Sequence, residues 1–265
     1  MSTLLLVHAH PDDEAISTGG VMMRAHSDGH RVVLVTATRG ELGEIHNMDE
    51  ESTRPRLAEV RTEELRRAAE ILGVDRQEFL GYRDSGMAGT DGNRDPRSFH
   101  MAPLGEAAER VAAIMREERP EVVVTYTPDG TYGHPDHIKA HHATVAAFDL
   151  LEREGRPPAK LYLHAIPREM MRAWRERASE LGIEPGTIQI EGIPEAEITT
   201  VVDVGDLVDA KRQAFGVHVS QNDPKSPFAT MADQIFRAAF GTENYVLARG
   251  ALGEERPERS LFSGR

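Results

Sequence analysis

At 265 residues the chain is long enough for one large α/β domain with a sizeable buried core, and its formal net charge is −13. The acidic balance, without a stripe of Lys and Arg, argues against nucleic acids and anionic membranes as partners, because both require clustered cations. The chain has no cysteine, so His, Asp, Glu or water must hold any metal ion, and disulfides and thiolate nucleophiles are excluded.

Apolar runs of strand length alternate with stretches of helical periodicity along the chain. Strands are predicted near residues 3–8, 31–37, 77–81, 121–127 and 160–165, with Ile188–Ile193 and Ile198–Val202 as later strands at a sheet edge. Helices are predicted near residues 17–28, 55–72, 105–118, 137–152, 168–181 and 206–218. This alternation predicts an α/β fold with a mainly parallel, doubly wound sheet and helices on both faces.

The organisation favours one domain over residues 1–250, followed by a surface tail over residues 251–265 that is rich in Glu and Arg. Two long segments, 38–54 and 82–103, follow strands and carry several glycines. Long loops at the strand-end side of a domain are often binding loops, so both are candidate substrate walls. A solvated connector is an equally good interpretation of the first.

Two polar segments follow apolar strand-like runs, His8–Glu14 near the start of the chain and Tyr132–His137 in its middle. Ligands of open α/β sheets bind in the crevice beyond the carboxyl ends of the strands. Two polar clusters at two such ends can therefore converge, although more than a hundred residues separate them. We expect them to form the two halves of one hydrolytic metal site.

The residue types suit a catalytic zinc ion, which takes three protein ligands and leaves one position for water. His10, Asp13 and His137 can fill those three positions. His134 lies three residues before His137 at a predicted helix start, and only one of this pair need bind the metal. Asp12 is adjacent to Asp13 and points elsewhere, so it can face the water as general base.

Attack of water on a carbonyl builds an oxyanion, which requires a cation or hydrogen-bond donor besides the metal. A protonated His134 would supply both charge and a proton for the leaving amine, and Asp136 could orient that imidazole.

A plainer interpretation exists for each segment, because His-Pro-Asp turns also cap helices. Two such turns at two strand ends favour the metal site over this interpretation. Glu14 is equally well interpreted as a partner that orients a ligand imidazole and as a first-turn helix acid. The remaining histidines are expected to be ordinary surface or packed residues, His218 least securely: His8, His26, His30, His100, His141, His142, His164 and His218.

At these residues the chain resembles the PIG-L/LmbE-like de-N-acetylases. Their first motif, Ala-His-Pro-Asp-Asp-Glu, matches Ala9–Glu14, and their second, His-Pro-Asp-His, matches His134–His137. The likeness extends to residues 59–65, Leu80–Met87 and His218–Gln221, in the same order along the chain.

The resemblance implies a Rossmann-like fold and zinc-dependent hydrolysis of an N-acyl group, commonly the acetamide of an N-acetylglucosaminyl compound. Carried over by motif position, the zinc ligands are His10, Asp13 and His137, and Asp12 is the general base. His134 is implied to stabilise the oxyanion. These roles agree with the chemical interpretation of the two segments.

In the branch that makes the thiols mycothiol and bacillithiol, positions similar to Ser17, Arg61 and Asp84 hold sugar or inositol hydroxyls, and one like Tyr132 moves over the reacting carbonyl. Without the resemblance, Arg61 would be interpreted as a solvated helix charge and Asp84 as a turn cap. The resemblance also implies a homo-oligomer.

We therefore expect a zinc-dependent hydrolase that removes an N-acetyl group from an N-acetylglucosaminyl-type small molecule. The alternatives are an amidase acting on a thiol S-conjugate or a secondary-metabolite pseudoglycoside, and a non-catalytic metal-binding or sugar-binding protein. Fe²⁺, Mn²⁺ or Co²⁺ would also suit a site of N and O ligands. The sequence lacks a long apolar run and a signal-peptide pattern, so we expect a cytoplasmic location with no membrane partner.

Overall fold

The computed structural model describes residues 1–176, 190–225 and 227–264 of the chain. In this part of the chain, strands assemble into one sheet: β1 (Thr3–His8), β2 (Arg31–Thr36), β3 (Arg76–Phe79), β4 (Val122–Tyr126), β5 (Lys160–Ala165), β6 (Thr200–Asp203) and β7 (Thr242–Arg249).

The described helices are α1 (Asp13–Ser17), α2 (Gly19–Ser27), α3 (Glu50–Thr53), α4 (Leu57–Leu72), α5 (Leu104–Glu118), α6 (Gly130–Gly133), α7 (Pro135–Arg153), α8 (Arg168–Glu176), α9 (Val208–Gly216), α10 (Pro227–Thr230) and α11 (Asp233–Phe240). Short 3₁₀ turns cover Arg54–Arg56, Asp91–Arg94, Glu195–Glu197 and Gly205–Leu207.

The strand order is β3-β2-β1-β4-β5-β7-β6, in which the first five strands run parallel and β7 runs antiparallel to both its neighbours. The chain leaves β1 for β2 on one side and later returns to β4 on the other. The strand order therefore reverses between β1 and β4, which is where open α/β sheets bind their ligands. The predicted α/β fold with a mainly parallel sheet is confirmed.

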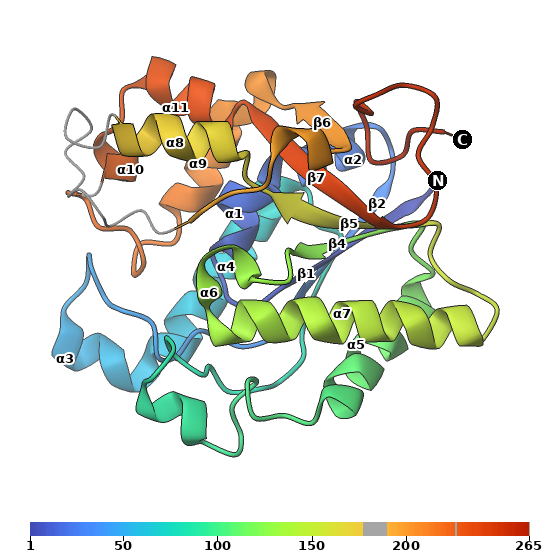
Figure 1. Cartoon of the computed structure of the whole chain (residues 1–265). Helices are drawn as coiled ribbons and strands as arrows, with labels where there is room; N and C mark the ends of the chain where they lie inside the picture. The colour runs from blue at the N-terminus through green and yellow to red at the C-terminus, as the bar shows by residue number, and fades with distance from the viewer. Residues whose placement is uncertain (177–189, 226, 265) are drawn as a thin grey trace.

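Alternate side chains of the central strands enter two separate cores, as the period of two in a strand requires. In β1, Leu5 and Val7 pack in the core under α5 and α7, whereas Leu4 and Leu6 face the core under α2 and α4. Figure 1 shows α5 and α7 on one side of the sheet and α2, α8, α9 and α11 toward the other. Both faces are apolar, so the strands are continuous apolar runs.

The strands predicted at 3–8, 31–37, 77–81, 121–127 and 160–165 are confirmed as β1 to β5 within two residues at either end. The helix predicted at 17–28 is confirmed as α2, and the pattern missed the short helix α1 before it, from which Thr18 separates it with a non-helical φ of −142°.

The edge strand predicted at 198–202 is β6, but the pattern missed β7, which inserts between β5 and β6. Of the strand predicted at 188–193, the first two residues lie outside the described residues, and Ile193 forms only an isolated bridge with Pro167. The end of the helix predicted at 168–181 also lies outside them.

The prediction of a surface tail after Gly250 is wrong for Glu258 and Leu261, which are 0% and 3% exposed. The backbone of Glu258 exchanges hydrogen bonds with Thr199 and Val201 beside β6. Its carboxylate accepts a hydrogen bond of 2.8 Å from the Lys160 ammonium group. A buried charge pair of this kind is invisible in the composition of the tail, because its partner lies on β5.

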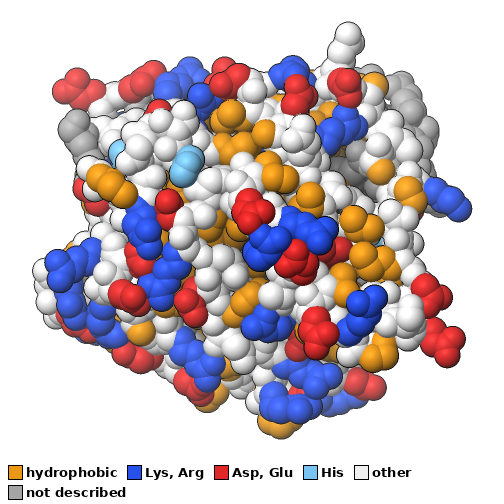
Figure 2. Space-filling view, turned by 180° about the vertical axis from the view of Figure 1, so that it is seen from behind, with side chains coloured by type: hydrophobic (Ala, Val, Ile, Leu, Met, Phe, Trp, Pro, Cys, Tyr) orange, Lys and Arg blue, Asp and Glu red, His pale blue; other side chains and the backbone are white. Residues whose placement is uncertain are grey.

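Figure 2 shows the face of the molecule opposite to that of Figure 1, with acidic and basic side chains interspersed over it. Among the described residues, no helix is long and apolar enough to span a membrane.

We predict that Glu258→Ala lowers the free energy of unfolding by about 3 kcal/mol, because it leaves the buried Lys160 ammonium without its charged partner. Urea denaturation measures the change. Glu255→Ala is the matched control in the same segment, since its carboxylate is exposed and lies 3.6 Å from Arg259, and should cost less than about 0.5 kcal/mol. Equal unfolding midpoints for the two variants would contradict the prediction.

Candidate active site

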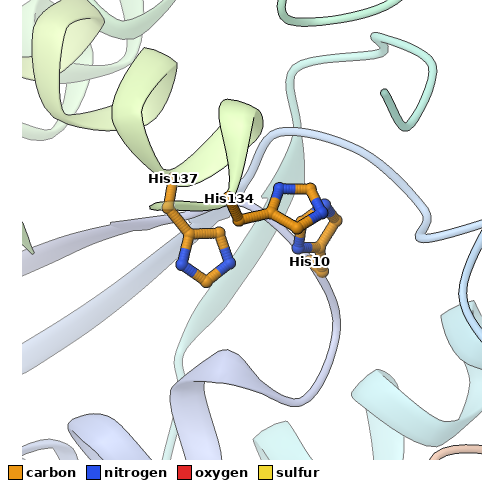
Figure 3. Close-up of side chains that lie close together, drawn as sticks. All are labelled: His10, His134 and His137. Atoms are coloured by element: carbon orange, nitrogen blue, oxygen red, sulfur yellow. The ribbon is translucent and has the colours of Figure 1, made fainter. Parts of the chain in front are cut away.

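The two polar segments meet at the carboxyl ends of β1 and β4, which are adjacent strands. His10 lies in the loop that follows β1, and His134 and His137 lie at the start of α7. Figure 3 shows the three imidazoles gathered in one place, with His134 and His137 coming from the amino-terminal start of α7 and His10 from the loop. One nitrogen of each lies within 4.8 Å of the others. The predicted convergence is therefore confirmed.

Asp13 lies between the two other predicted metal ligands. Its Oδ1 is 3.4 Å from His137 Nε2, and its Oδ2 is 3.6 Å from His10 Nδ1. Two ligand atoms on one tetrahedral zinc ion lie about 3.3 Å apart when each metal bond is about 2.0 Å. Each imidazole thus lies at about this spacing from one oxygen of Asp13, although the two oxygens differ. A carboxylate oxygen and two imidazole nitrogens are a donor set that suits zinc.

Asp13 is held by hydrogen bonds as well as by its charged neighbours. Its Oδ2 accepts hydrogen bonds from the backbone of His10 at 2.9 Å and from the Tyr126 hydroxyl at 2.7 Å. Burial alone would raise the pKa of Asp13, but His137 and His10 hold this pKa well below its usual range. Asp13 is therefore an anion. Both hydrogen bonds end on Oδ2, so Oδ1 faces His137 without either of them.

His10 is oriented from its other side by two carboxylates. Its Nε2 lies 3.2 Å from Asp136 Oδ2 and 3.5 Å from Asp84 Oδ1. Burial opposes a charged imidazole, yet Asp84, Asp13 and Asp136 together raise the pKa of His10 well above its usual value. A carboxylate on one ring nitrogen fixes the tautomer and directs the other nitrogen toward a metal.

Asp136 was expected to orient His134, but its carboxylate lies on His10 and on Ser85. The Ser85 backbone donates a 2.9 Å hydrogen bond to Asp136 Oδ2, and the Ser85 hydroxyl donates to Oδ1. His134 instead accepts a hydrogen bond at Nδ1 from the backbone N–H of Asp136, at 3.1 Å, and caps α7. The His134 ring therefore contacts the backbone of Asp136 at the start of α7 and not its carboxylate. The carboxylate lies against His10, in the loop after β1.

The bond at Nδ1 assigns the proton of a neutral His134 ring to Nε2. Burial and the neighbouring His10 lower the pKa of His134 to about 4, so the ring is neutral near pH 7. The expected protonated His134 is not what this environment favours, because the ring is buried beside a second cationic group. A neutral ring with a proton on Nε2 remains a hydrogen-bond donor.

Asp12 adopts a backbone conformation that is rare for a residue with a side chain, with φ at 110°. Its Oδ2 lies 3.3 Å from Arg61 Nη2. Burial raises the pKa of Asp12 to about 6, although Arg61 opposes the shift. A carboxylate with such a pKa can take up a proton and release it again near neutral pH.

Arg61 is buried on α4, and its guanidinium braces the loop that carries Asp12. It donates hydrogen bonds to the carbonyl of Pro11 at 2.5 Å and to that of Gly40 at 2.7 Å. Gly40 has a φ of 65°, and a Cβ there would lie 2.2 Å from Arg61 Nη1. The loop after β2 therefore needs glycine to approach this side chain.

The other predicted substrate contacts differ in how they lie. Asp84 is buried and accepts backbone hydrogen bonds from Leu42 at 3.0 Å and from Gly86 at 2.8 Å. Burial raises the pKa of Asp84, but His10 and these two hydrogen bonds together lower it below its usual range. Tyr132 is 46% exposed, with its hydroxyl 3.3 Å from His137 Nε2. Ser17 ends α1 and is half-buried, and no hydrogen bond recorded among the described residues ties its side chain to the cluster.

A hollow of about 430 Å³ lies between the start of segment 38–54 and segment 82–103, lined among others by Thr38, Glu41, Tyr82 and Arg97. Its position at the ends of β2 and β3 agrees with these loops being walls of a binding site, which stays a prediction.

Tyr126 and Ser85 were missed by sequence reasoning, although they hold Asp13 and Asp136. The sequence places Tyr126 within a predicted apolar strand. The one feature that pointed to a role in the site is that its hydroxyl-bearing side chain lies at the end of this strand, close to the second polar segment. His218 was expected to be an ordinary packed residue, but its imidazole lies 2.7 Å from the Glu14 carboxylate.

Residues 5–148 match the family model described as PIG-L, GlcNAc-PI de-N-acetylase. The chain is 41% identical to a 1D-myo-inositol 2-acetamido-2-deoxy-alpha-D-glucopyranoside deacetylase of Acidothermus cellulolyticus, over 99% of this chain and 94% of that protein. It also resembles the solved structure of N,N'-diacetylchitobiose deacetylase from Pyrococcus horikoshii, at 21% identity and a TM-score of 0.64, over 93% of this chain and 83% of that one.

A similar fold occurs in GalB, a 4-carboxy-2-hydroxymuconate hydratase from Pseudomonas putida, at 22% identity and a TM-score of 0.64, over 96% of this chain and 99% of that one. The fold alone therefore does not decide the chemistry. The family match and the site together define a hydrolase of the N-deacetylase class. The chain belongs to the PIG-L family of de-N-acetylases.

We predict that His137→Ala weakens zinc binding by more than about 100-fold, because it removes one of the three protein ligands that the sequence predicts. Metal content after dialysis and titration with a zinc indicator measure the loss. His142→Ala, an exposed histidine on the same helix, is the matched control and should bind zinc as the parent protein does. Unchanged affinity in the His137 variant would remove this residue from the ligand set.

Proposed function

We propose that this protein is a zinc-dependent deacetylase that removes the acetyl group from an N-acetylglucosaminyl-inositol compound. The observation that carries the proposal is the position of Asp13 between His10 and His137, next in the chain to Asp12. The relatives with about 40% identity are named as deacetylases of such a compound, and they align over nearly the whole chain.

His10, Asp13 and His137 would hold the ion, which supplies a positive charge that polarises the amide carbonyl and acidifies a water molecule. Zinc suits the small N and O donor set, and Fe²⁺, Mn²⁺ or Co²⁺ would also suit it. Asp136 and Asp84 keep His10 oriented, and Tyr126 keeps Asp13 oriented, so little rearrangement is needed to form the site.

Asp12 acts as the general base. It takes a proton from the attacking water, and its pKa of about 6 suits the return of that proton to the leaving amine. Arg61 lies 3.3 Å from Asp12 and keeps the carboxylate partly charged despite its burial.

His134 donates a hydrogen bond from Nε2 to the oxyanion that forms on the carbonyl carbon. The Asp136 backbone bond at Nδ1 supports this role because it fixes the neutral tautomer. The amine then receives its proton from Asp12 more readily than from His134, whose pKa is about 4. Tyr132 is exposed beside His137 and closes over the reacting carbonyl.

Ser17, Arg61 and Asp84 are the proposed contacts to sugar or inositol hydroxyls. Asp84 is a carboxylate that accepts hydrogen bonds, and Arg61 presents several N–H groups in a fixed fork. Both also brace the loops of the site, so their replacement should affect the catalytic geometry as well as substrate affinity.

We predict that the protein releases acetate from N-acetylglucosaminyl-inositol, that chelation abolishes the release, and that added zinc restores it. Acetate and free-amine assays of purified, chelated and zinc-restored protein measure this. N-acetylglucosamine and a thiol S-conjugate are the comparison substrates. Release from the conjugate alone would reject the proposed substrate class, and release that survives complete metal removal would reject the metal dependence.

We predict that Asp12→Asn lowers kcat by about 10²- to 10⁴-fold and leaves zinc content unchanged, because the amide cannot accept the proton of the attacking water. Steady-state kinetics and metal analysis of the same preparation measure both. Asp28→Asn, at the exposed end of α2, is the control and should retain the parental rate. Full activity of the Asp12 variant would exclude it as the base.

A further inference from the structure

His218 lies just beyond α9, about two hundred residues along the chain from the loop after β1 that carries Asp12 and Asp13, yet its side chain contacts Glu14 next to that loop. Its side chain is fully buried, at 0% exposure. The imidazole donates a hydrogen bond of 2.7 Å from Nε2 to Glu14 Oε1. Neither His218 nor Glu14 has a part in the metal site or in the proposed reaction.

Glu14 links His218 to Asp12, the proposed general base. Its second oxygen, Oε2, accepts a 2.8 Å hydrogen bond from the backbone N–H of Asp12. A single buried carboxylate thus bridges the His218 ring and the Asp12 backbone. The bridge has a definite geometry, because both carboxylate oxygens are engaged.

The Asp12 backbone needs such a restraint. Its φ of 110° lies in the region that side-chain-bearing residues rarely adopt, and conformations of this kind persist only where the surroundings hold them. The Asp12 carbonyl is held from the other side by the Ala15 N–H, at 3.1 Å. Asp12 is the residue before α1, but its side chain makes no capping bond to that helix. Its carboxylate lies instead 3.3 Å from the Arg61 guanidinium.

We propose that His218 is a positioning residue for catalysis: through Glu14 it holds the backbone of Asp12 in the conformation that aims the general base at the reacting water. This inference rests on the proposed function, since it assumes that Asp12 is the base. His218 itself does not contact the substrate.

A purely structural role for His218 is the competing explanation, and neighbouring contacts argue against it. Ser220 already ties the same segment to α4, because its backbone N–H and its hydroxyl each donate a 2.7 Å hydrogen bond to Glu64. Asn222 adds a 2.8 Å bond to the carbonyl of Phe215. The segment is therefore anchored without a buried histidine–carboxylate pair, which is costly to desolvate.

The test compares His218→Ala, His218→Gln and Ser220→Ala as zinc-loaded enzymes with N-acetylglucosaminyl-inositol. We expect His218→Ala to lower kcat by about 10- to 100-fold with KM within about twofold, because a base that is misplaced by a fraction of an ångström loses rate rather than substrate affinity. His218→Gln should recover most of the rate, since its amide can donate to Glu14. Ser220→Ala removes a buried bond of the same segment and should keep the parental kcat.

A double-mutant cycle with Asp12→Asn shows whether His218 acts through Asp12. If it does, adding His218→Ala to Asp12→Asn causes no further loss of rate. Independent, multiplying losses would overturn the inference, as would equal losses in the His218→Ala and Ser220→Ala variants. These outcomes leave the proposed function intact, whereas an active Asp12→Asn enzyme would reject the base itself.

Discussion

The parallel pairing of β1 with β4 is the constraint on which the rest of this structure depends. Leu4 to Leu6 pair with Val122 to Val124, and both strands are buried on both faces. Their carboxyl ends therefore lie side by side at the point where the strand order reverses. Each end continues into a turn of His, Pro and Asp residues. The proposed metal ligands come from these two turns, so their relative positions depend on the pairing of the two strands.

Three carboxylates surround His10, those of Asp13, Asp84 and Asp136, and Asp12 precedes Asp13 in the same loop. Each of the four has a different set of partners. Asp13 is bound by Tyr126, Asp136 by Ser85, Asp84 by backbone N–H groups, and Asp12 by Arg61. Buried charges are tolerated only when they are paired and hydrogen-bonded. The partners thus keep Asp13 and Asp84 ionised, whereas burial outweighs the ion pair of Asp12 with Arg61 and raises the pKa of Asp12. Different environments give similar residues different chemical roles.

The carboxyl-terminal part of the chain supports the amino-terminal catalytic loop through buried polar bonds. Glu243 on β7 accepts hydrogen bonds from the first N–H groups of α2, at Gly20 and Val21, and is paired with Lys211 at 2.6 Å. These contacts fix the helix that follows the catalytic loop and α1. His218 reaches Glu14 from the same part of the chain. This part of the chain, which holds none of the proposed metal ligands, therefore supports the loop that carries Asp12 and Asp13.

The sequence by itself determined the first five strands and the identity of the two polar segments that carry the chemistry. Apolar runs predicted β1 to β5, and the two His-Pro-Asp turns predicted the convergence, because both signals are local and have a regular spacing. Only the tertiary structure decided that Asp136 serves His10, that Glu258 is buried and that β7 enters the sheet. Each of these depends on a partner distant in sequence. Such partners are chosen by how strands and helices pack, which the residues of one segment do not specify.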